Sequence, residues 1–169
     1  MPLPPRHRRI LIVLLPLPTR IGIASPPPLG PENVINGDFE TGAFAPDWTT
    51  GGAGAGDISI ATGTPGSSYV YSGSKGVQSG PWNGQTGYLA QVITLAAGTY
   101  TLSFWLNASG GGTMFRVYWE GVQIANLDAA SGGWTNHTYT VTATGPTSEL
   151  KFDMQNEPSY YGLDNVSVR

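Results

Sequence analysis

The sequence contains no cysteine, so the fold cannot depend on disulfide bonds and no cysteine-ligated zinc site is available. Only 11% of the 169 residues are charged, and only two histidines are present. His7 and His137 lack the spacing of a paired metal motif. No apolar run is long enough to cross a bilayer as a helix. These absences exclude disulfide scaffolds, cysteine-based zinc domains and a helical membrane span.

Catalytic motifs are also missing. The sequence has no Gly-x-Ser-x-Gly elbow, no Walker loop and no His-Glu-x-x-His pair. Two carboxylates can hydrolyse a glycosidic bond, and Glu120 or Glu149 with Asp153 are the only loose candidates. Glu120 lies in a predicted turn, where a solvated charge is the ordinary explanation. We therefore expect no enzymatic activity.

Basic residues are few and unevenly placed. Residues 1–32 carry four arginines and one glutamate, whereas residues 33–169 carry four basic and ten acidic side chains. An acidic domain without a lysine or arginine stripe is not suited to binding nucleic acid. We expect no nucleic-acid partner.

What the sequence has in quantity is glycine, with 24 residues, together with aromatic and β-branched residues. From Asn33 onward no window of apolar residues shows helical spacing. Short alternating runs separated by turn residues recur instead, which is typical of a sandwich or barrel. The strongest run places Leu102, Phe104 and Leu106 on one face and Trp105 on the other. The sequence predicts an all-β, jelly-roll β-sandwich with about nine or ten strands.

Turn signals divide these runs. Glu120-Gly121 indicates a tight turn between two strands, and residues 107–112 are predicted to form a loose hairpin. Tyr69–Tyr71 is predicted as a short strand that leads into a loop over residues 72–76.

The N-terminal segment resembles an export signal. A basic stretch at residues 6–9 precedes a short apolar run at 10–15 and a small-residue cleavage site at 22–24. We predict a signal peptide over residues 1–24, a proline-rich linker over 25–32 and one domain over 33–169. A mistaken start codon or a disordered basic tail is the alternative. The export interpretation places the domain outside the cell.

Two acidic clusters mark the ends of this domain. Asp38 and Glu40 lie near its start, and Asp164 shares the parity of Val166 and Val168 in a predicted last strand. A buried carboxylate must be neutralised by hydrogen bonds, a basic partner or a metal ion. We expect the first and last strands to meet at these clusters.

Three motifs carry a resemblance to a known superfamily: Asn-Gly-Asp-Phe-Glu-Thr-Gly at 36–42, Gly-Thr-Tyr-Thr-Leu-Ser-Phe-Trp at 98–105 and Tyr-Gly-Leu-Asp-Asn-Val-Ser-Val at 161–168. In this order they resemble galactose-binding-like jelly rolls. The resemblance is greatest to family 4/9-type carbohydrate-binding modules and to exported bacterial domains that often precede a PEP-CTERM sorting tail. It covers about residues 33–169 and is more specific for fold than for ligand.

The resemblance implies a structural calcium ion that joins the ends of the domain. Its ligands would be the side chains of Glu40 and Asp164, a backbone or side-chain oxygen of Asp38, and a carbonyl near Lys75. The alternative is that Glu40 and Asp164 cap turns or accept backbone N–H bonds.

A sugar site needs an exposed aromatic platform flanked by amides, carboxylates and a guanidinium. Strand parity turns several such side chains away from the core, and loops add two more aromatics. The predicted carbohydrate-binding residues are Trp105, Arg116, Tyr118, Asp153 and Gln155, closed by Trp82 and Tyr160, with Lys151 beside them. If their strands are neighbours, the strand residues form one patch on one sheet. Alternatively, Trp105 packs beneath a loop.

The predicted function is therefore that of a secreted, non-catalytic module that binds a polysaccharide or other glycan. The alternative is a structural domain that contacts other surface or matrix proteins without a sugar ligand.

Overall fold

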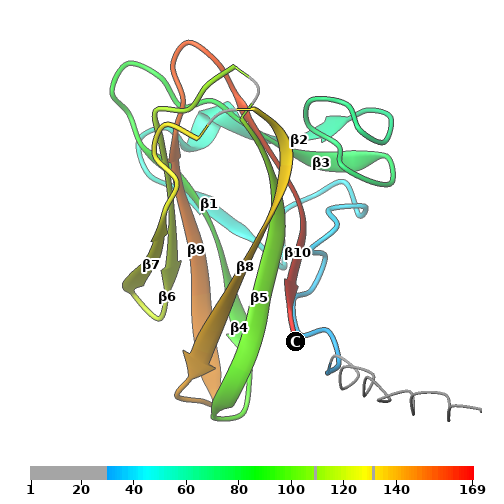
Figure 1. Cartoon of the computed structure of the whole chain (residues 1–169), viewed down its shortest axis with the longest axis vertical. Helices are drawn as coiled ribbons and strands as arrows, with labels where there is room; N and C mark the ends of the chain where they lie inside the picture. Colours follow the sequence, from blue (N-terminus) through cyan, green and yellow to red (C-terminus); the bar gives the residue numbers. More distant parts are fainter. Residues whose placement is uncertain (1–29, 109, 131) are drawn as a thin grey trace, which may run out of the picture.

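The computed structural model describes residues 30–169 except 109 and 131, and shows two facing antiparallel β-sheets (Figure 1). Sheet A has the strand order β1-β4-β9-β6-β7 and sheet B the order β2-β3-β10-β5-β8. The strands are β1 (Thr49–Gly51), β2 (Ile58–Thr62), β3 (Lys75–Ser79), β4 (Gly87–Thr94), β5 (Gly98–Ala108), β6 (Met114–Trp119), β7 (Val122–Asn126), β8 (Gly132–Ala143), β9 (Thr147–Gln155) and β10 (Tyr161–Val168), with a 3-10 turn at Ala55–Asp57. The predicted all-β jelly-roll sandwich is confirmed.

The core lies between the two sheets and contains the aromatic residues that alternate along the strands. Phe104 of β5 in sheet B contacts Phe152 of β9 and Phe115 of β6 in sheet A, at ring-centroid distances of 5.2 and 6.1 Å. All three side chains are fully buried. Alternation therefore predicted the inward faces of β5, β6 and β9 correctly, because successive side chains of a strand point to opposite faces.

Two local predictions are wrong. The predicted hairpin at 107–112 is wrong, because β5 ends at Ala108 in sheet B and β6 begins at Met114 in sheet A. Tyr69–Tyr71 is not a strand but part of a loop that lies against sheet B. Its backbone bonds to side chains instead of to a neighbouring strand: Tyr71 N–H donates to Asp164 Oδ2 over 2.8 Å.

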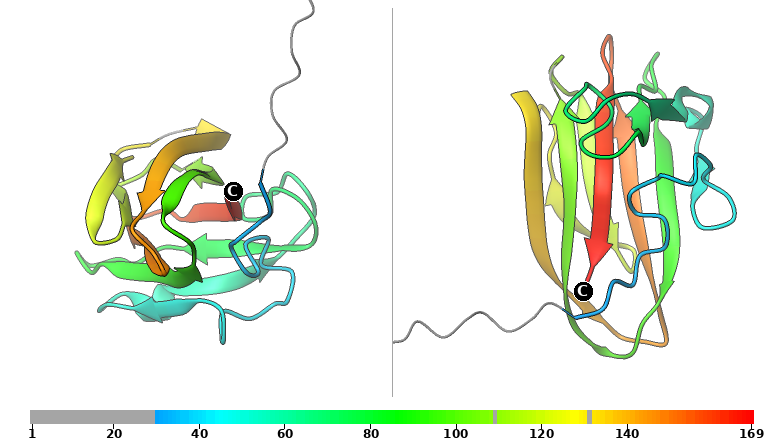
Figure 2. Two further views of the ribbon diagram at one scale, coloured as in Figure 1. Left: turned by 90° about the horizontal axis from the view of Figure 1, so that it is seen from below. Right: turned by 90° about the vertical axis from the view of Figure 1, so that its right-hand side faces the viewer.

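The two ends of the domain meet, although the opening segment is a series of turns and not a strand. Figure 2 shows this segment beside β10. Asn33 N–H donates to the Val168 carbonyl over 3.0 Å, and Val166 N–H donates to the Gly37 carbonyl over 2.9 Å. Glu32 also joins the two ends, because its carboxylate accepts hydrogen bonds from Val168 N–H and Arg169 Nε. The opening segment thereby covers one side of β10.

The predicted export signal and residues 25–29 of the predicted linker lie outside the described residues. Among the residues that are described, no helix is long and apolar enough to cross a membrane.

Candidate functional site

Glu40 and Asp164 both turn their carboxylates to the loop between β2 and β3. Glu40 Oε1 accepts N–H bonds from Ser74 and Lys75 over 2.7 and 2.8 Å, and its Oε2 accepts the Ser74 hydroxyl over 2.8 Å. Asp164 Oδ2 accepts N–H bonds from Tyr71 and Ser72 over 2.8 and 3.1 Å. The loop is thus held by carboxylates from both ends of the domain.

The pKa values of the two carboxyl groups are shifted in opposite directions. Asp164 is fully buried, and this burial raises its pKa to about 6, an effect that backbone N–H bonds oppose and the charge of Glu40 reinforces. The backbone N–H bonds from Ser74 and Lys75 instead lower the pKa of Glu40, which is exposed. At neutral pH the pair therefore places two negative charges near one another, one of them fully buried.

The remaining predicted metal residues are placed less favourably. Asp38 Oδ1 accepts Glu40 N–H over 3.3 Å, and the Asp38 side chain lines a cavity on sheet B. Lys75 directs its N–H to Glu40, while its ammonium donates to Thr62 Oγ1 over 2.7 Å. Within the described ranges, no three histidine, aspartate or glutamate side chains gather as a metal site. A cation here would need carbonyl or water oxygens beside the two carboxylates.

The outer face of sheet A brings together four of the predicted carbohydrate residues, Arg116, Tyr118, Asp153 and Gln155, with Lys151 between them. We call this surface, with Tyr88 of β4 added, the sheet A face. It borders a depression of about 390 Å³ lined by Tyr88 and Lys151, among others. The condition that these strands are neighbours therefore holds for β6 and β9.

The cations of the sheet A face are already engaged. Lys151 Nζ lies 4.6 Å from the ring centroid of Tyr118 and 3.0 Å from Asp153 Oδ1. Arg116 donates to Asp128 Oδ2 through Nε and Nη2 over 3.2 and 2.8 Å. The ammonium covers the Tyr118 ring, so this face offers little free aromatic surface.

Trp105 does not belong to this patch, which corrects the predicted grouping. It lies on β5 in the other sheet, where the Tyr71 ring stacks on it at 3.7 Å with an interplanar angle of 13°. Trp134 meets Tyr71 edge-on at 5.7 Å. The alternative that Trp105 packs beneath a loop is therefore correct for one face of its ring.

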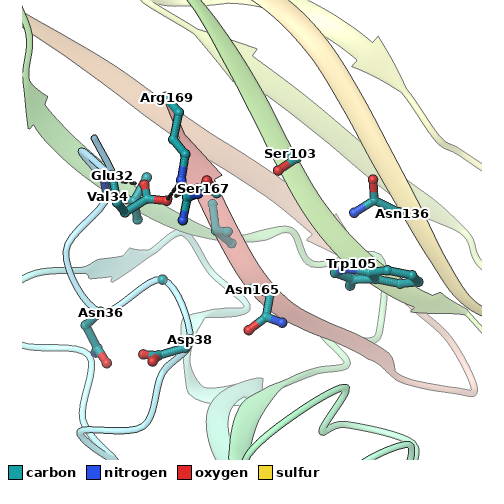
Figure 3. A pocket seen from close by; sticks show the side chains of 12 residues that line it. Glu32, Val34, Asn36, Asp38, Ser103, Trp105, Asn136, Asn165, Ser167 and Arg169 are labelled. Atoms are coloured by element: carbon teal, nitrogen blue, oxygen red, sulfur yellow. Dashed lines mark hydrogen bonds and ion pairs between the residues drawn. The ribbon is translucent and has the colours of Figure 1, made fainter. Parts of the chain in front are cut away.

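Trp105 borders a cavity of about 540 Å³, which we call the lateral cavity (Figure 3). Its floor is the outer face of β5, β8 and β10, and the opening segment forms one wall. The lining is Glu32, Val34, Asn36, Gly37, Asp38, Ser103, Trp105, Asn136, Asn165, Val166, Ser167 and Arg169.

Trp82 and Tyr160 share a third location, at the end of the sandwich where β9 passes to β10, at the top of Figure 1. We call it the end cavity. Its volume is about 330 Å³, and it is lined by Asp57, Gly80, Trp82, Asn156, Glu157, Pro158, Ser159 and Tyr160. Trp82 is 55% exposed and Tyr160 is 44% exposed. No other described tryptophan, tyrosine or phenylalanine is exposed to this degree.

The loops of the end cavity are held by the protein itself. Glu157 Oε2 accepts Asn83 N–H over 2.9 Å, which ties the two loops together. Buried Asn156 donates from Nδ2 to the Gly111 carbonyl over 3.1 Å. A side chain at Gly80 would collide with the Tyr160 ring, so glycine permits the ring to lie directly on the backbone. The aromatic residues therefore project from a supported frame.

Sequence reasoning missed several of these residues. Tyr88 alternates with buried Leu89, so its parity was sufficient to place it on the sheet A face. Asp57 and Glu157 flank strands, but nothing in their spacing indicates that they share a cavity with Trp82. Nothing in the sequence indicated that Tyr71 stacks on Trp105, because this contact depends on how its loop folds back onto sheet B.

The loose catalytic candidates have structural partners. Glu120 accepts hydrogen bonds from Thr144 N–H and from the Thr144 and Ser148 hydroxyls over 3.0, 3.0 and 2.6 Å. These bonds lower the pKa of Glu120, with that from Ser148 contributing most. Glu120 thus joins the β6–β7 turn to the β8–β9 connection instead of being only a solvated charge.

Neither protein-family models nor curated proteins give a match to the chain. Solved structures do. The carbohydrate-binding module TmCBM61, solved in complex with β-1,4-galactotriose, is 21% identical with a TM-score of 0.62 over 81% of this chain and 97% of that chain. The K3 cleaved adhesin domain of Lys-gingipain from Porphyromonas gingivalis W83 is 22% identical with a TM-score of 0.57 over 80% and 98%. These similarities confirm the jelly-roll fold that the sequence motifs resemble.

Proposed function

We propose that the chain is a non-catalytic carbohydrate-binding module that holds its glycan at the end cavity. The observation that carries the proposal is the pair of exposed rings, Trp82 and Tyr160, in one cavity. A sugar ring presents an apolar C–H face, and a planar side chain covers this face at little cost in conformational entropy.

Exposure distinguishes the end cavity from the other two surfaces. Tyr71 covers one face of Trp105, and Lys151 lies over Tyr118. Because stacking requires a free ring face, neither of these rings is as available as Trp82 or Tyr160.

The polar lining of the end cavity suits hydroxyl groups. Asp57 and Glu157 supply carboxylate oxygens, which accept hydrogen bonds from sugar hydroxyls. A few fixed polar groups around an apolar platform are the usual composition of a small-molecule site.

The fold similarity supports the proposal and suggests a first probe. TmCBM61 was solved with β-1,4-galactotriose, so that oligosaccharide heads the panel to be tested. Isothermal titration calorimetry of the full chain would measure its binding beside that of neutral β-glucan and β-xylan oligosaccharides. We expect one of these to bind with a Kd in the micromolar to millimolar range, and Trp82→Ala to abolish the signal. Equal binding by Trp82→Ala and the wild type would refute the location.

We extend the proposal to a calcium ion between Glu40 and Asp164. Asp164 Oδ1 and Glu40 Oε2 each accept a single hydrogen bond from a described residue, so each retains acceptor capacity. No described lysine or arginine pairs with Asp164, and a divalent cation would offset its buried charge. The alternative is that the N–H donors around both carboxylates stabilise their charges without a metal ion.

Thermal unfolding tests the calcium proposal separately from the glycan. A ligand that binds only the folded state raises Tm by mass action. We expect calcium to raise Tm of the full chain and the chelator EGTA to reverse the change, with no response in Asp164→Ala. Identical melting curves in calcium and EGTA would refute the calcium proposal without affecting the glycan proposal.

The location of the protein is part of the same proposal. The export-like N-terminal sequence supports action outside the cell, where polysaccharides are available. N-terminal sequencing of protein recovered from a culture medium would test this, with cleavage near residue 24 expected. Should no glycan bind, the alternative of a surface or matrix contact domain would take its place.

A further inference from the structure

The lateral cavity contains a tryptophan whose N–H group has no described partner. Trp48, Trp119 and Trp134 each donate from Nε1 to a backbone carbonyl, over 3.0, 2.8 and 2.8 Å. For Trp82 and Trp105, no acceptor is found among the described residues. Each of these two tryptophans borders a cavity.

Other polar groups of the lateral cavity are also available. Within the described part of the chain, Ser103 Oγ and Asp38 Oδ2 have no hydrogen-bond partner. Asn136 Nδ2 makes only a long bond of 3.5 Å to the Phe104 carbonyl. In Figure 3, Asp38 and Trp105 lie on opposite sides of the cavity. The cavity therefore offers donors and acceptors from two walls to one ligand.

Trp105 is held in place before any ligand arrives. The stack with Tyr71 at 3.7 Å fixes its ring plane, and the loop that carries Tyr71 is tied down by Asp164 and by Trp134 Nε1, which donates to the Ser67 carbonyl. A rigid donor loses little entropy on binding, so even a single N–H bond to a ligand is useful.

Charge selects the chemical class of the ligand. Glu32 and Arg169 form an ion pair at 3.0 Å, so Asp38 leaves the lining with an excess of negative charge. Among the lysines and arginines of the described chain, Arg169 alone lines the cavity, and Glu32 already pairs with it. The lining therefore has no unpaired lysine or arginine to receive a carboxylate or sulfate, so uronates and sulfated sugars are disfavoured.

We infer that the lateral cavity is a second binding site, for a short neutral saccharide, and that the domain is bivalent for sugar. Its volume of about 540 Å³ lies in the range of small-molecule sites. Trp105 Nε1 donates to a ring or hydroxyl oxygen, and Asp38, Ser103 and Asn136 bond to the hydroxyls. The lining shares no residue with the end cavity, so sugar binding here is tested separately, whereas bivalence also rests on the proposed function.

The test is a titration of the ¹⁵N-labelled full chain, monitored by the indole N–H signals of its five tryptophans. Trp82→Phe and Trp105→Phe assign two of these signals. The probes are galactose, glucose and β-1,4-galactobiose, with glucuronate as the anionic comparison, each up to 100 mM. We expect the Trp105 signal to shift and saturate with a neutral probe, and to do so equally when Trp82 and Tyr160 are both alanine.

Two cavity variants establish the location. Ser103→Ala and Asp38→Asn should each weaken the response of the Trp105 signal by about three- to tenfold, the effect of losing one hydrogen bond. Thr140→Ala changes an exposed side chain elsewhere on β8 and should leave the response unchanged. Circular dichroism melts verify that each variant is folded.

The outcomes separate the two sites. A Trp105 signal that no neutral probe moves overturns the inference, and movement of Trp82 alone leaves only the end cavity. A Trp105 shift that vanishes with the Trp82 and Tyr160 substitutions also overturns it, since both signals would then report one site. Tighter binding of glucuronate than of every neutral probe contradicts the assigned ligand class.

Discussion

Trp82 and Trp105 show two ways in which one sandwich presents an aromatic side chain. Trp82 lies on a loop at the end of the domain, more than half exposed, beside exposed Tyr160. Trp105 lies on β5, an interior strand of sheet B, and is half-buried under the Tyr71 ring. The loop residue offers ring faces, whereas the strand residue offers a fixed N–H group.

The difference follows from what surrounds each ring. Trp105 is supported in turn by Tyr71, whose N–H binds Asp164, the residue opposite Trp105 on β10. Trp82 makes no ring contact with another described aromatic residue. Replacing Trp82 should therefore change binding, whereas changing the support of Trp105 should change stability first.

The largest effect is expected from Trp82→Ala combined with Tyr160→Ala. Loss of both platforms should weaken glycan binding by roughly 100-fold, because buried aromatic contacts dominate such interfaces. Affinity electrophoresis in gels that contain the polysaccharide would measure this. Tyr160 also packs on the Gly80 backbone and meets Tyr69 edge-on at 6.2 Å, so the control is a circular dichroism spectrum that shows the double variant folded at the assay temperature. Binding within about threefold of the wild type would contradict the comparison.

The next largest effect is expected from Tyr71→Ala. It removes the stack on Trp105 and the edge contact with Trp134, and should lower the free energy of unfolding by about 2 kcal/mol. Urea denaturation of the full chain provides the measurement, with Trp82→Ala as the matched control at less than about 0.5 kcal/mol. Equal losses in the two variants would erase the distinction between supported and exposed rings.

Asp164→Asn tests how the buried carboxyl beneath the Tyr71 loop changes stability with pH. The pKa of Asp164 in the folded protein is raised from 3.8 to about 6, so its contribution to stability is present below pH 4 and lost as pH rises through 6. In EGTA the difference between wild-type and variant unfolding free energies should therefore change with pH between 4 and 6. Across this range the wild type should lose stability relative to Asp164→Asn as pH rises, by on the order of 3 kcal/mol in total.

Chemical denaturation at several pH values would follow this difference. Glu40→Gln is the opposite control, because the lowered pKa of Glu40 gives stability that is lost as pH falls. A difference between wild type and Asp164→Asn that stays constant from pH 4 to 6 would show that the buried carboxyl has an ordinary pKa.

The smallest effect is expected on the sheet A face. Tyr118→Ala should alter glycan affinity by less than about threefold, because Lys151 already covers its ring. Isothermal titration calorimetry with the best-binding oligosaccharide is the measurement. A loss as large as that of the Trp82 and Tyr160 variant would move the principal site to sheet A.

The sequence predicted the sandwich because alternation reports which side chains face inward. Phe104, Phe115 and Phe152 are buried as expected. Alternation does not report which sheet a strand joins, so Trp105 and Arg116 were both correctly turned outward but lie on opposite sheets. The pairing of strands depends on contacts distant in sequence, which a local pattern does not contain.

The candidate sites were predictable only in part for the same reason. The meeting of Glu40 and Asp164 at one loop follows from motifs at the two ends of the chain. The stack of Tyr71 on Trp105 depends on how a loop without regular hydrogen bonding folds back over sheet B. Loop positions of this kind are determined by tertiary contacts and not by periodicity.

A crystal structure of the full chain with the neutral oligosaccharide that binds best would test the central claim most directly. We expect electron density for a sugar ring against Trp82 or Tyr160, with its hydroxyl groups near Asp57 or Glu157. Density on the sheet A face, with the end cavity empty, would contradict it.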